Sequence, residues 1–219
     1  MKNLHQFILI AGASLALAAP TPFCSMAASA DPAPKPSSVP AKKIVPAPGA
    51  TTATKRPELI ANGSVAPDFV SKDLAGKEVK LSDHKGKIVV LDFWATWCGP
   101  CVQSLPHTQE VARKVKDQGV VVLAVCTSDA RDKFEAFVKA NQSTYSDIVF
   151  TCDPNVRDSA TYAERASTKH YRVSGIPTQF VIGKDGKIVG ALVGYSTGDK
   201  RLEAMLEQVG VKMDAAAAK

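Results

Sequence analysis

Apolar residues follow two alternating patterns between Leu59 and Val209. Continuous apolar runs predict buried strands, and the clearest are residues 88–94 (IVVLDFW) and 119–125 (GVVVLAV). Three shorter strands are predicted at residues 148–151, 178–182 and 187–193. Apolar residues spaced three or four apart predict helices at residues 100–116, 131–140, 156–172 and 199–209. This alternation predicts an α/β fold in which helices flank a central mixed sheet.

Two local signals add detail to this pattern. Lys184-Asp185-Gly186 separates the last two predicted strands and indicates a hairpin turn. Pro106 lies in the middle of the first predicted helix. A proline there removes a backbone hydrogen bond, so a kink is expected.

The N-terminus has the pattern of a secretory signal. Lys2 and His5 precede an apolar run at residues 7–19, and Ala28-Ser29-Ala30 fits the small-residue cleavage rule. The run is shorter than the roughly 20 residues that cross a bilayer. We therefore predict that residues 1–30 are a signal peptide and that the protein is exported to the periplasm. An uncleaved N-terminal membrane anchor is the alternative.

Residues 31–57 are rich in Pro, Ala and Lys and poor in large apolar side chains. Such a segment buries too little apolar surface to offset the entropy of ordering, which predicts a disordered linker. Residues 58–212 are then the folded domain, and residues 213–219 are a flexible tail. From Glu58 onward the chain has 21 of its 27 Lys and Arg and 20 of its 21 Asp and Glu. A domain so nearly neutral is not typical of proteins that bind nucleic acid.

Cys98 and Cys101 form a Cys-x-x-Cys motif after a predicted buried strand and at the start of a predicted helix. Unpaired N–H groups and the helix dipole favour negative charge there, so they stabilise the nucleophilic thiolate. Pro100 suits the first turn of a helix, where its missing N–H costs little. We predict that Cys98 attacks a substrate disulfide and that Cys101, one helical turn away, resolves the product.

A Cys-x-x-Cys motif can instead be half of a structural zinc site, which needs a second pair of ligands. Cys126 and Cys152 are isolated at predicted strand ends, and His107 indicates no fourth ligand. The apolar strand before the motif also favours redox chemistry. We expect no bound metal and no cofactor beyond the redox-active Cys98–Cys101 pair.

Residues 91–101 (LDFWATWCGPC) resemble the active-site segment of thioredoxins. Residues 66–69 (APDF), 74–77 (LAGK) and 81–83 (LSD) resemble the N-terminal hairpin of the exported TlpA/ResA-like branch of the thioredoxin superfamily. Residues 174–178 (SGIPT) resemble the segment with the family's cis-proline. The resemblance covers about residues 65–208. It implies a thioredoxin fold with the N-terminal hairpin and the inserted strand and helix of this branch.

The resemblance also implies roles for residues around the cysteine pair. Pro177 should follow a cis peptide bond, with Ile176 lying against the sulfur atoms. The backbone of Ile176 could then pair with an extended substrate chain. Trp97, Gly99 and Pro100 would contact the substrate as well, with Trp97 shielding one side of the sulfur. The alternative for Pro177 is a trans bond at the start of a strand.

Asp92 is a lone acid in an apolar strand, where burial disfavours its charged form. Thioredoxins have an Asp at the matching position, which assists proton transfer at the second cysteine. Members of the TlpA/ResA-like branch often have Asn there and a Glu three residues after the second cysteine, where this chain has Ser104. We therefore expect Asp92 to do the acid–base work. An Asp that is only hydrogen-bonded in the core is the alternative.

Cys126 and Cys152 follow two strands that are parallel neighbours in the resembling branch. Their carboxyl ends would lie on the active-site side of the sheet. A disulfide needs Cα atoms about 4.4 to 6.8 Å apart, which neighbouring strands can provide. A second disulfide, two separate buried thiols and a second redox or metal role all remain open.

The resemblance implies a protein-disulfide reductase, since Gly-Pro between the cysteines is the dipeptide of strongly reducing thioredoxins. Its partners would be protein disulfide substrates and a membrane electron donor of the CcdA/DsbD type. Maturation of c-type cytochromes is a common assignment in this branch. We expect a monomer.

Three other functions are considered. They are a disulfide oxidase or isomerase on the same fold, a metal-binding thiol chaperone using Cys98, Cys101 and Cys126, and a non-catalytic interaction domain. A peroxidase is disfavoured because related peroxidases have a Thr three residues before their cysteine, where this chain has Ala95.

Overall fold

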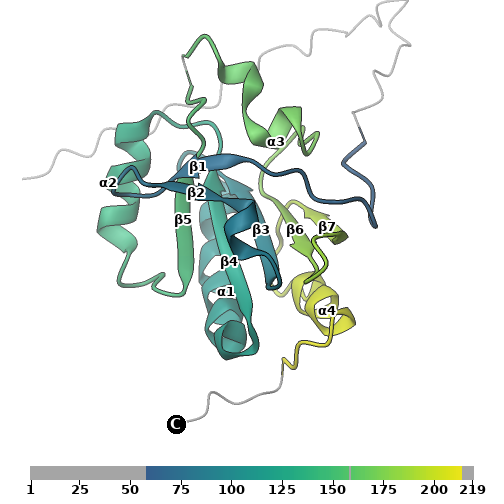
Figure 1. The fold of residues 1–219 in the computed structure, drawn as a ribbon. Helices are drawn as coiled ribbons and strands as arrows, with labels where there is room; N and C mark the ends of the chain where they lie inside the picture. The colour runs from purple at the N-terminus through teal and green to yellow at the C-terminus, as the bar shows by residue number, and fades with distance from the viewer. Residues whose placement is uncertain (1–57, 158, 214–219) are drawn as a thin grey trace, which may run out of the picture. The chain divides into compact units, whose positions relative to one another are not determined.

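The computed structural model describes residues 58–157 and 159–213, which form one seven-stranded sheet with helices against it (Figure 1). The strands lie in the order β2 (Glu78–Lys80), β1 (Val70–Lys72), β5 (Ile148–Cys152), β4 (Val120–Cys126), β3 (Ile88–Trp94), β6 (Thr178–Ile182) and β7 (Ile188–Val193). β3, β4 and β5 are parallel, and the other pairings are antiparallel. The predicted mixed sheet is confirmed.

The signal peptide and the linker predicted for residues 1–57 lie outside the described residues, as does most of the predicted tail. Those assignments stay predictions. Within the described part of the chain, no helix has the length and apolar character needed to cross a membrane.

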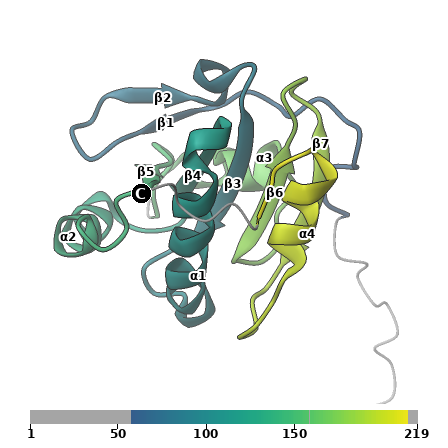
Figure 2. The same cartoon turned by 90° about the horizontal axis from the view of Figure 1, so that it is seen from below.

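The long helices cover one face of the sheet. These helices are α1 (Gly99–Val115), α2 (Arg131–Asn141) and α4 (Arg201–Gln208), labelled in Figure 2. Their buried apolar residues belong to one cluster with Trp94 and Cys126. The opposite face is covered by the short α3 (Ala166–Lys169), by the residues before β1 and by the residues between α3 and β6. Phe69 and Tyr171, one from each of these two segments, contact Phe93. Each face of the sheet therefore has its own apolar core.

β3 lies inside the sheet, between β4 and β6. All seven of its residues are buried, because β4 and β6 pair with its two edges and apolar side chains cover its two faces. This environment explains why its sequence is a continuous apolar run rather than an alternating one. After the carboxyl end of β3, only residues 95–98 precede the start of α1.

Both predicted hairpins are present. In the turn between β6 and β7, the Gly183 N–H donates to the Lys187 carbonyl at 2.9 Å, and Gly186 has a φ of 77°, which glycine adopts without steric cost. The N-terminal hairpin pairs Val70 with Lys80 and Lys72 with Glu78.

The helix predicted at residues 156–172 is wrong. The segment is mostly loop, with a short 3-10 turn at Tyr162–Glu164 and the single-turn helix α3. The carboxylate of Asp153 accepts the Ala166 N–H at 2.7 Å and so starts a new helix there. Arg165 is extended (φ −57°, ψ 142°), which interrupts any helix continuing from Tyr162. A contact over 13 residues therefore overrides the local helical pattern.

We expect Asp153→Ala to lower the free energy of unfolding by about 2 kcal/mol, because it leaves the buried N–H of Ala166 without its acceptor. Urea denaturation measures the change. Asp185→Ala is the control, since Asp185 accepts the Lys187 N–H at an exposed turn, and its loss should cost less than about 0.5 kcal/mol. Equal costs for the two variants would show that Asp153 does not organise this loop.

Candidate active site

The Cys98–Cys101 pair lies where β3 passes into α1, and the two sulfur atoms are bonded at 2.07 Å. Cys98 is the N-cap residue of α1, and its sulfur accepts the Cys101 N–H at 3.2 Å. Gly99 and Pro100 form the exposed first turn. The structure thus holds the oxidised form of the predicted pair. In the reduced form, the same N–H and the helix dipole would stabilise a Cys98 thiolate.

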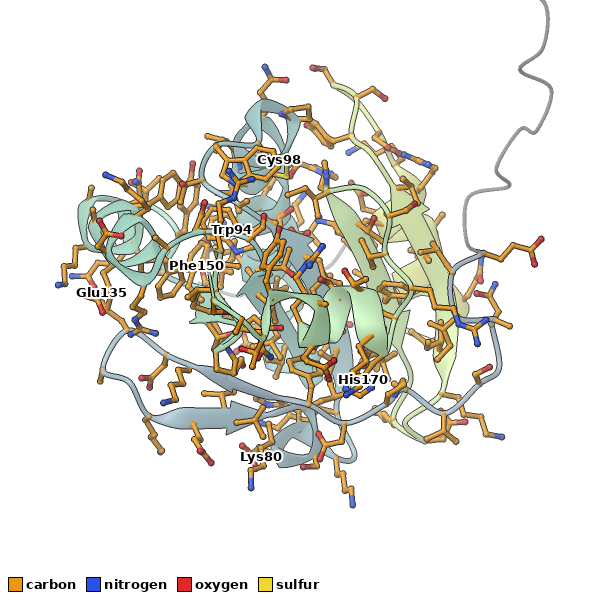
Figure 3. All side chains as sticks on the ribbon, turned by 90° about the horizontal axis from the view of Figure 1, so that it is seen from above. Lys80, Trp94, Cys98, Glu135, Phe150 and His170 are labelled. Carbon is orange, nitrogen blue, oxygen red and sulfur yellow. A yellow bond between two sulfur atoms is a disulfide. The ribbon has the colours of Figure 1, made fainter. Side chains whose placement is uncertain are left out.

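The two sulfurs differ in access. Cys98 is 5% exposed, whereas Cys101 is fully buried under the first turn of α1. Of the two cysteines, only Cys98 has any solvent-accessible surface. This difference supports the predicted roles of attacking thiol and resolving thiol. Figure 3 labels Cys98 near the top of the view, with Trp94 and then Phe150 below it.

The predicted cis peptide bond is present between Ile176 and Pro177. It brings the Ile176 carbonyl oxygen to 3.6 Å from the Cys98 sulfur. Ile176 precedes β6, and within the described part of the chain its N–H donates to no other group. The N–H and the carbonyl of Ile176 could thus both form hydrogen bonds with a substrate chain that lies beside Cys98.

Trp97 forms the exposed wall of the site. Its side chain is 56% exposed, and the Arg157 guanidinium lies 5.3 Å from the ring centroid. Its indole N–H points to the Ser128 carbonyl at 3.5 Å. A large exposed aromatic ring beside a reactive sulfur is a surface for substrate contact.

Asp92 is fully buried beneath the site and interacts with one side chain. Gln179, its register partner on β6, donates to one carboxylate oxygen at 3.0 Å and to the Thr108 hydroxyl at 3.2 Å. The other oxygen has no partner in the described part of the chain. Burial raises the pKa of Asp92 to about 6, and the Gln179 hydrogen bond only partly offsets this. Asp92 can therefore exchange a proton near neutral pH.

Ser104 does not replace the missing acid. Its hydroxyl donates to the Cys101 carbonyl at 2.7 Å, back into its own helix. Its hydroxyl proton is therefore engaged within α1 and is not directed at the Cys101 sulfur. Asp92 on β3 remains the candidate acid for Cys101.

Cys126 and Cys152 are register partners on β4 and β5, and both are buried free thiols. Cys126 donates to the Asp129 carboxylate at 3.1 Å, whereas Cys152 donates to the Asp153 carbonyl at 3.5 Å. Contact with Cys152, burial and the Asp129 carboxylate all raise the pKa of Cys126. The same contact lowers the pKa of Cys152. The two thiols are not bonded to each other in this structure, and the second disulfide and the second redox role stay predictions.

Two residues of this region were not found by sequence reasoning. Asp129 accepts the Thr96 N–H at 2.7 Å and so ties the loop before Cys98 to the end of β4. Its position just past the carboxyl end of a buried strand was the available signal. Gln179 is recognisable only when the pairing of β3 with β6 is known, because the register alone brings it to Asp92.

Among the described residues, the second pair of ligands that a zinc site needs is not brought to Cys98 and Cys101. His107 instead contacts the Glu203 carboxylate at 2.9 Å. Among the described residues, no three His, Cys, Asp or Glu side chains are grouped in a way that could hold a metal ion.

Residues 62–191 match the AhpC/TSA family model. The chain belongs to the AhpC/TSA family. Among curated relatives, the thiol-disulfide oxidoreductase ResA of Bacillus cereus is 35% identical over 147 residues, which are 67% of this chain and 78% of the relative. The ResA protein of Geobacillus kaustophilus is 37% identical over 150 residues, which are 68% of this chain and 79% of the relative.

Solved structures agree with this assignment. A Chlorobium tepidum chain assigned by name as the thiol:disulfide interchange protein DsbE has a TM-score of 0.57 and 33% identity, over 68% of this chain and 97% of its own. A thiol:disulfide interchange protein from Bacteroides sp. has a TM-score of 0.53 and 26% identity, over 68% and 90%. This AhpC/TSA-family protein therefore has the predicted thioredoxin fold and is a thiol–disulfide oxidoreductase of the ResA/DsbE type.

The pKa of Asp92 predicts a pH-dependent cost to stability. The folded protein holds this proton up to about pH 6, whereas an unfolded Asp loses it near pH 4. Stability therefore falls as the pH rises between these values, by about 3 kcal/mol in total, and stays lower above them. We expect Asp92→Asn to raise the free energy of unfolding by about 2 kcal/mol at pH 7.5 and to have little effect at pH 4.

Urea denaturation of the oxidised protein from pH 4 to pH 7.5 measures this difference. Asp185→Asn, at an exposed turn, is the matched control and should leave the pH profile unchanged. If Asp92→Asn altered stability equally at every pH, ionisation of this buried carboxyl group would not be the cause.

Proposed function

We propose that this protein reduces disulfides in exported protein substrates by dithiol–disulfide exchange. The observation that carries the proposal is the access of the two sulfurs: Cys98 at the surface end of α1, beside the Ile176 backbone, with Cys101 buried behind it. Dithiol–disulfide exchange needs one thiol that attacks the substrate disulfide. It also needs a second thiol that attacks only the mixed disulfide formed by the first thiol.

In the proposed cycle, the Cys98 thiolate attacks one sulfur of the substrate disulfide. A mixed disulfide forms, and the other substrate sulfur leaves as a thiolate. Cys101 loses its proton and attacks the Cys98 sulfur, which releases the second substrate thiolate. Two electrons have then passed from the enzyme to the substrate, and the enzyme holds the Cys98–Cys101 disulfide.

Asp92 is the proposed acceptor of the Cys101 proton. Its pKa of about 6 leaves it mostly ionised at pH 7 and still close enough to neutrality to return the proton. Trp97 and Pro100 offer apolar surface to the substrate, and the Ile176 backbone groups pair with its main chain.

The direction of the cycle and its location are part of the proposal. Gly99-Pro100 between the cysteines supports reduction, by resemblance to reducing thioredoxins. The signal-like residues 1–30 support export to the periplasm. In that oxidising compartment, a membrane electron donor of the CcdA/DsbD type would return the pair to the dithiol. Apocytochrome c, whose Cys-x-x-Cys-His cysteines must be reduced before haem attachment, is one substrate of this class.

We expect Cys101→Ser, expressed with residues 1–30 in a periplasm, to accumulate mixed disulfides, because the resolving thiol is gone. Non-reducing electrophoresis and mass spectrometry of the adducts identify Cys98 as the attachment site. The double variant Cys98→Ser with Cys101→Ser is the matched control and should capture nothing. Equal capture by the two variants, or none by either, would contradict the proposed cycle.

The reduction potential tests the direction. We expect a reduction potential of about −270 mV, as in thioredoxin. Equilibration with glutathione or dithiothreitol mixtures, followed by alkylation of the free thiols, measures it. A value near about −120 mV, as in strong disulfide oxidants, would reverse the direction and make the protein a disulfide oxidase or isomerase.

A further inference from the structure

A groove of about 420 Å³ lies beside the cysteine pair, on the side of Trp97. Trp97 and Ile176 form its active-site end. The rest of its wall comes from Arg157, from residues within 162–175, and from Thr127 and Ser128, which follow β4. A substrate chain that passes Cys98 alongside Ile176 therefore runs directly into this groove.

The groove is positively charged. Three arginines line it, Arg157, Arg165 and Arg172, and no carboxylate stands among its described lining residues. None of the three forms an ion pair with another described residue. Eight other described Lys and Arg side chains, such as Lys114 and Arg201, have a carboxylate partner.

This charge is local to the groove. From Glu58 onward the basic and acidic residues of the chain almost balance, with 21 Lys and Arg and 20 Asp and Glu. Three unpaired arginines on one wall are therefore a concentration of positive charge and not a sample of a generally basic surface. A ligand that neutralises them should carry carboxylates, which arginine binds in a planar, two-point geometry.

The loop that presents these arginines is anchored. The Asp153 carboxylate holds the Ala166 N–H, and the hydroxyl groups of Thr127 and Ser167 are in contact beneath the groove. Arg165 donates to the Tyr162 carbonyl at 2.8 Å, and its guanidinium lies 3.9 Å from the centroid of that ring. An arginine held in this way, as Arg165 is, loses little conformational freedom when it binds an anion.

We infer that this groove binds an acidic segment of the substrate polypeptide next to the disulfide that Cys98 attacks. The inference rests on the proposed function and names its substrate class: proteins whose reducible cysteine is flanked by Asp or Glu. The three guanidinium groups draw the acidic segment in and hold it while the sulfur atoms meet, so they raise the rate of the bimolecular step.

Three synthetic peptides test this, each closed by one disulfide and differing only at three flanking positions, which are Glu, Gln or Lys. The full chain is reduced beforehand, and the rate constant for each peptide is divided by that for 2-hydroxyethyl disulfide, which has no charge. We expect the Glu peptide to react about tenfold faster than the Gln peptide at low salt, and the Lys peptide to be slowest. The preference should shrink at high salt, where the charges are screened.

Replacing Arg157, Arg165 and Arg172 together by Gln should reduce the preference for the Glu peptide to less than about twofold. The matched control replaces Arg113, Lys184 and Lys187 by Gln, which removes the same charge far from the groove and should keep the tenfold preference. If the groove variant does not fold, Arg172→Gln alone, at an exposed position, should still halve the preference.

Equal rates for the Glu and Gln peptides with the unaltered chain would overturn the inference. So would a preference that survives in the groove variant or disappears equally in the control. Equal peptide rates together with binding to phosphatidylglycerol vesicles that only the groove variant loses would assign the groove to a membrane surface instead. Failure of the unaltered chain to reduce every disulfide, 2-hydroxyethyl disulfide included, would contradict the proposed function itself.

Discussion

The site depends on the burial of β3. This strand is held on both edges, by β4 and β6, and is covered on both faces, so its carboxyl end has a fixed direction. The first turn of α1 follows after only a few residues, and Cys98 is its cap. The burial of β3 in the core therefore fixes the direction of the backbone N–H groups that would stabilise a thiolate. The short loop between β3 and α1 does not fix it alone. The same register places Gln179 on Asp92 and brings Cys126 level with Trp94.

The sequence predicted most of this arrangement because most of it is local. A buried strand, a Cys-x-x-Cys motif and a following helix are encoded within residues 88–115, and the structure contains all three. The cis bond before Pro177 was expected from resemblance alone, since no local pattern determines it. The hairpin at Lys184-Asp185-Gly186 was predictable because its glycine adopts a backbone conformation that other residues avoid.

The parts that escaped prediction depend on contacts between distant residues. The helix expected at residues 156–172 is absent because Asp153 captures the Ala166 N–H and starts a new turn. No periodicity in that segment reveals such a contact. Asp129 and the arginine-lined groove were missed for the same reason, since the first needs the end of β4 beside Thr96 and the second needs the folded loop. The second cysteine pair could only be left open, because register partners on parallel strands are near each other whether or not they bond.

The segment from Gly63 to Lys80 has a consequence for the solubility of the fold. At one border of the sheet, Gly63 and Ser64 exchange backbone hydrogen bonds with Ile188, at the start of β7. At the other border, β1 and β2 cover β5, and the outermost strand is only three residues long, with Glu78 and Lys80 exposed. Short charged margins of this kind discourage a second molecule from extending the sheet and so oppose aggregation. Among the described residues, the Ile176 backbone beside Cys98 offers an N–H group with no partner, so it can pair with an extended substrate chain.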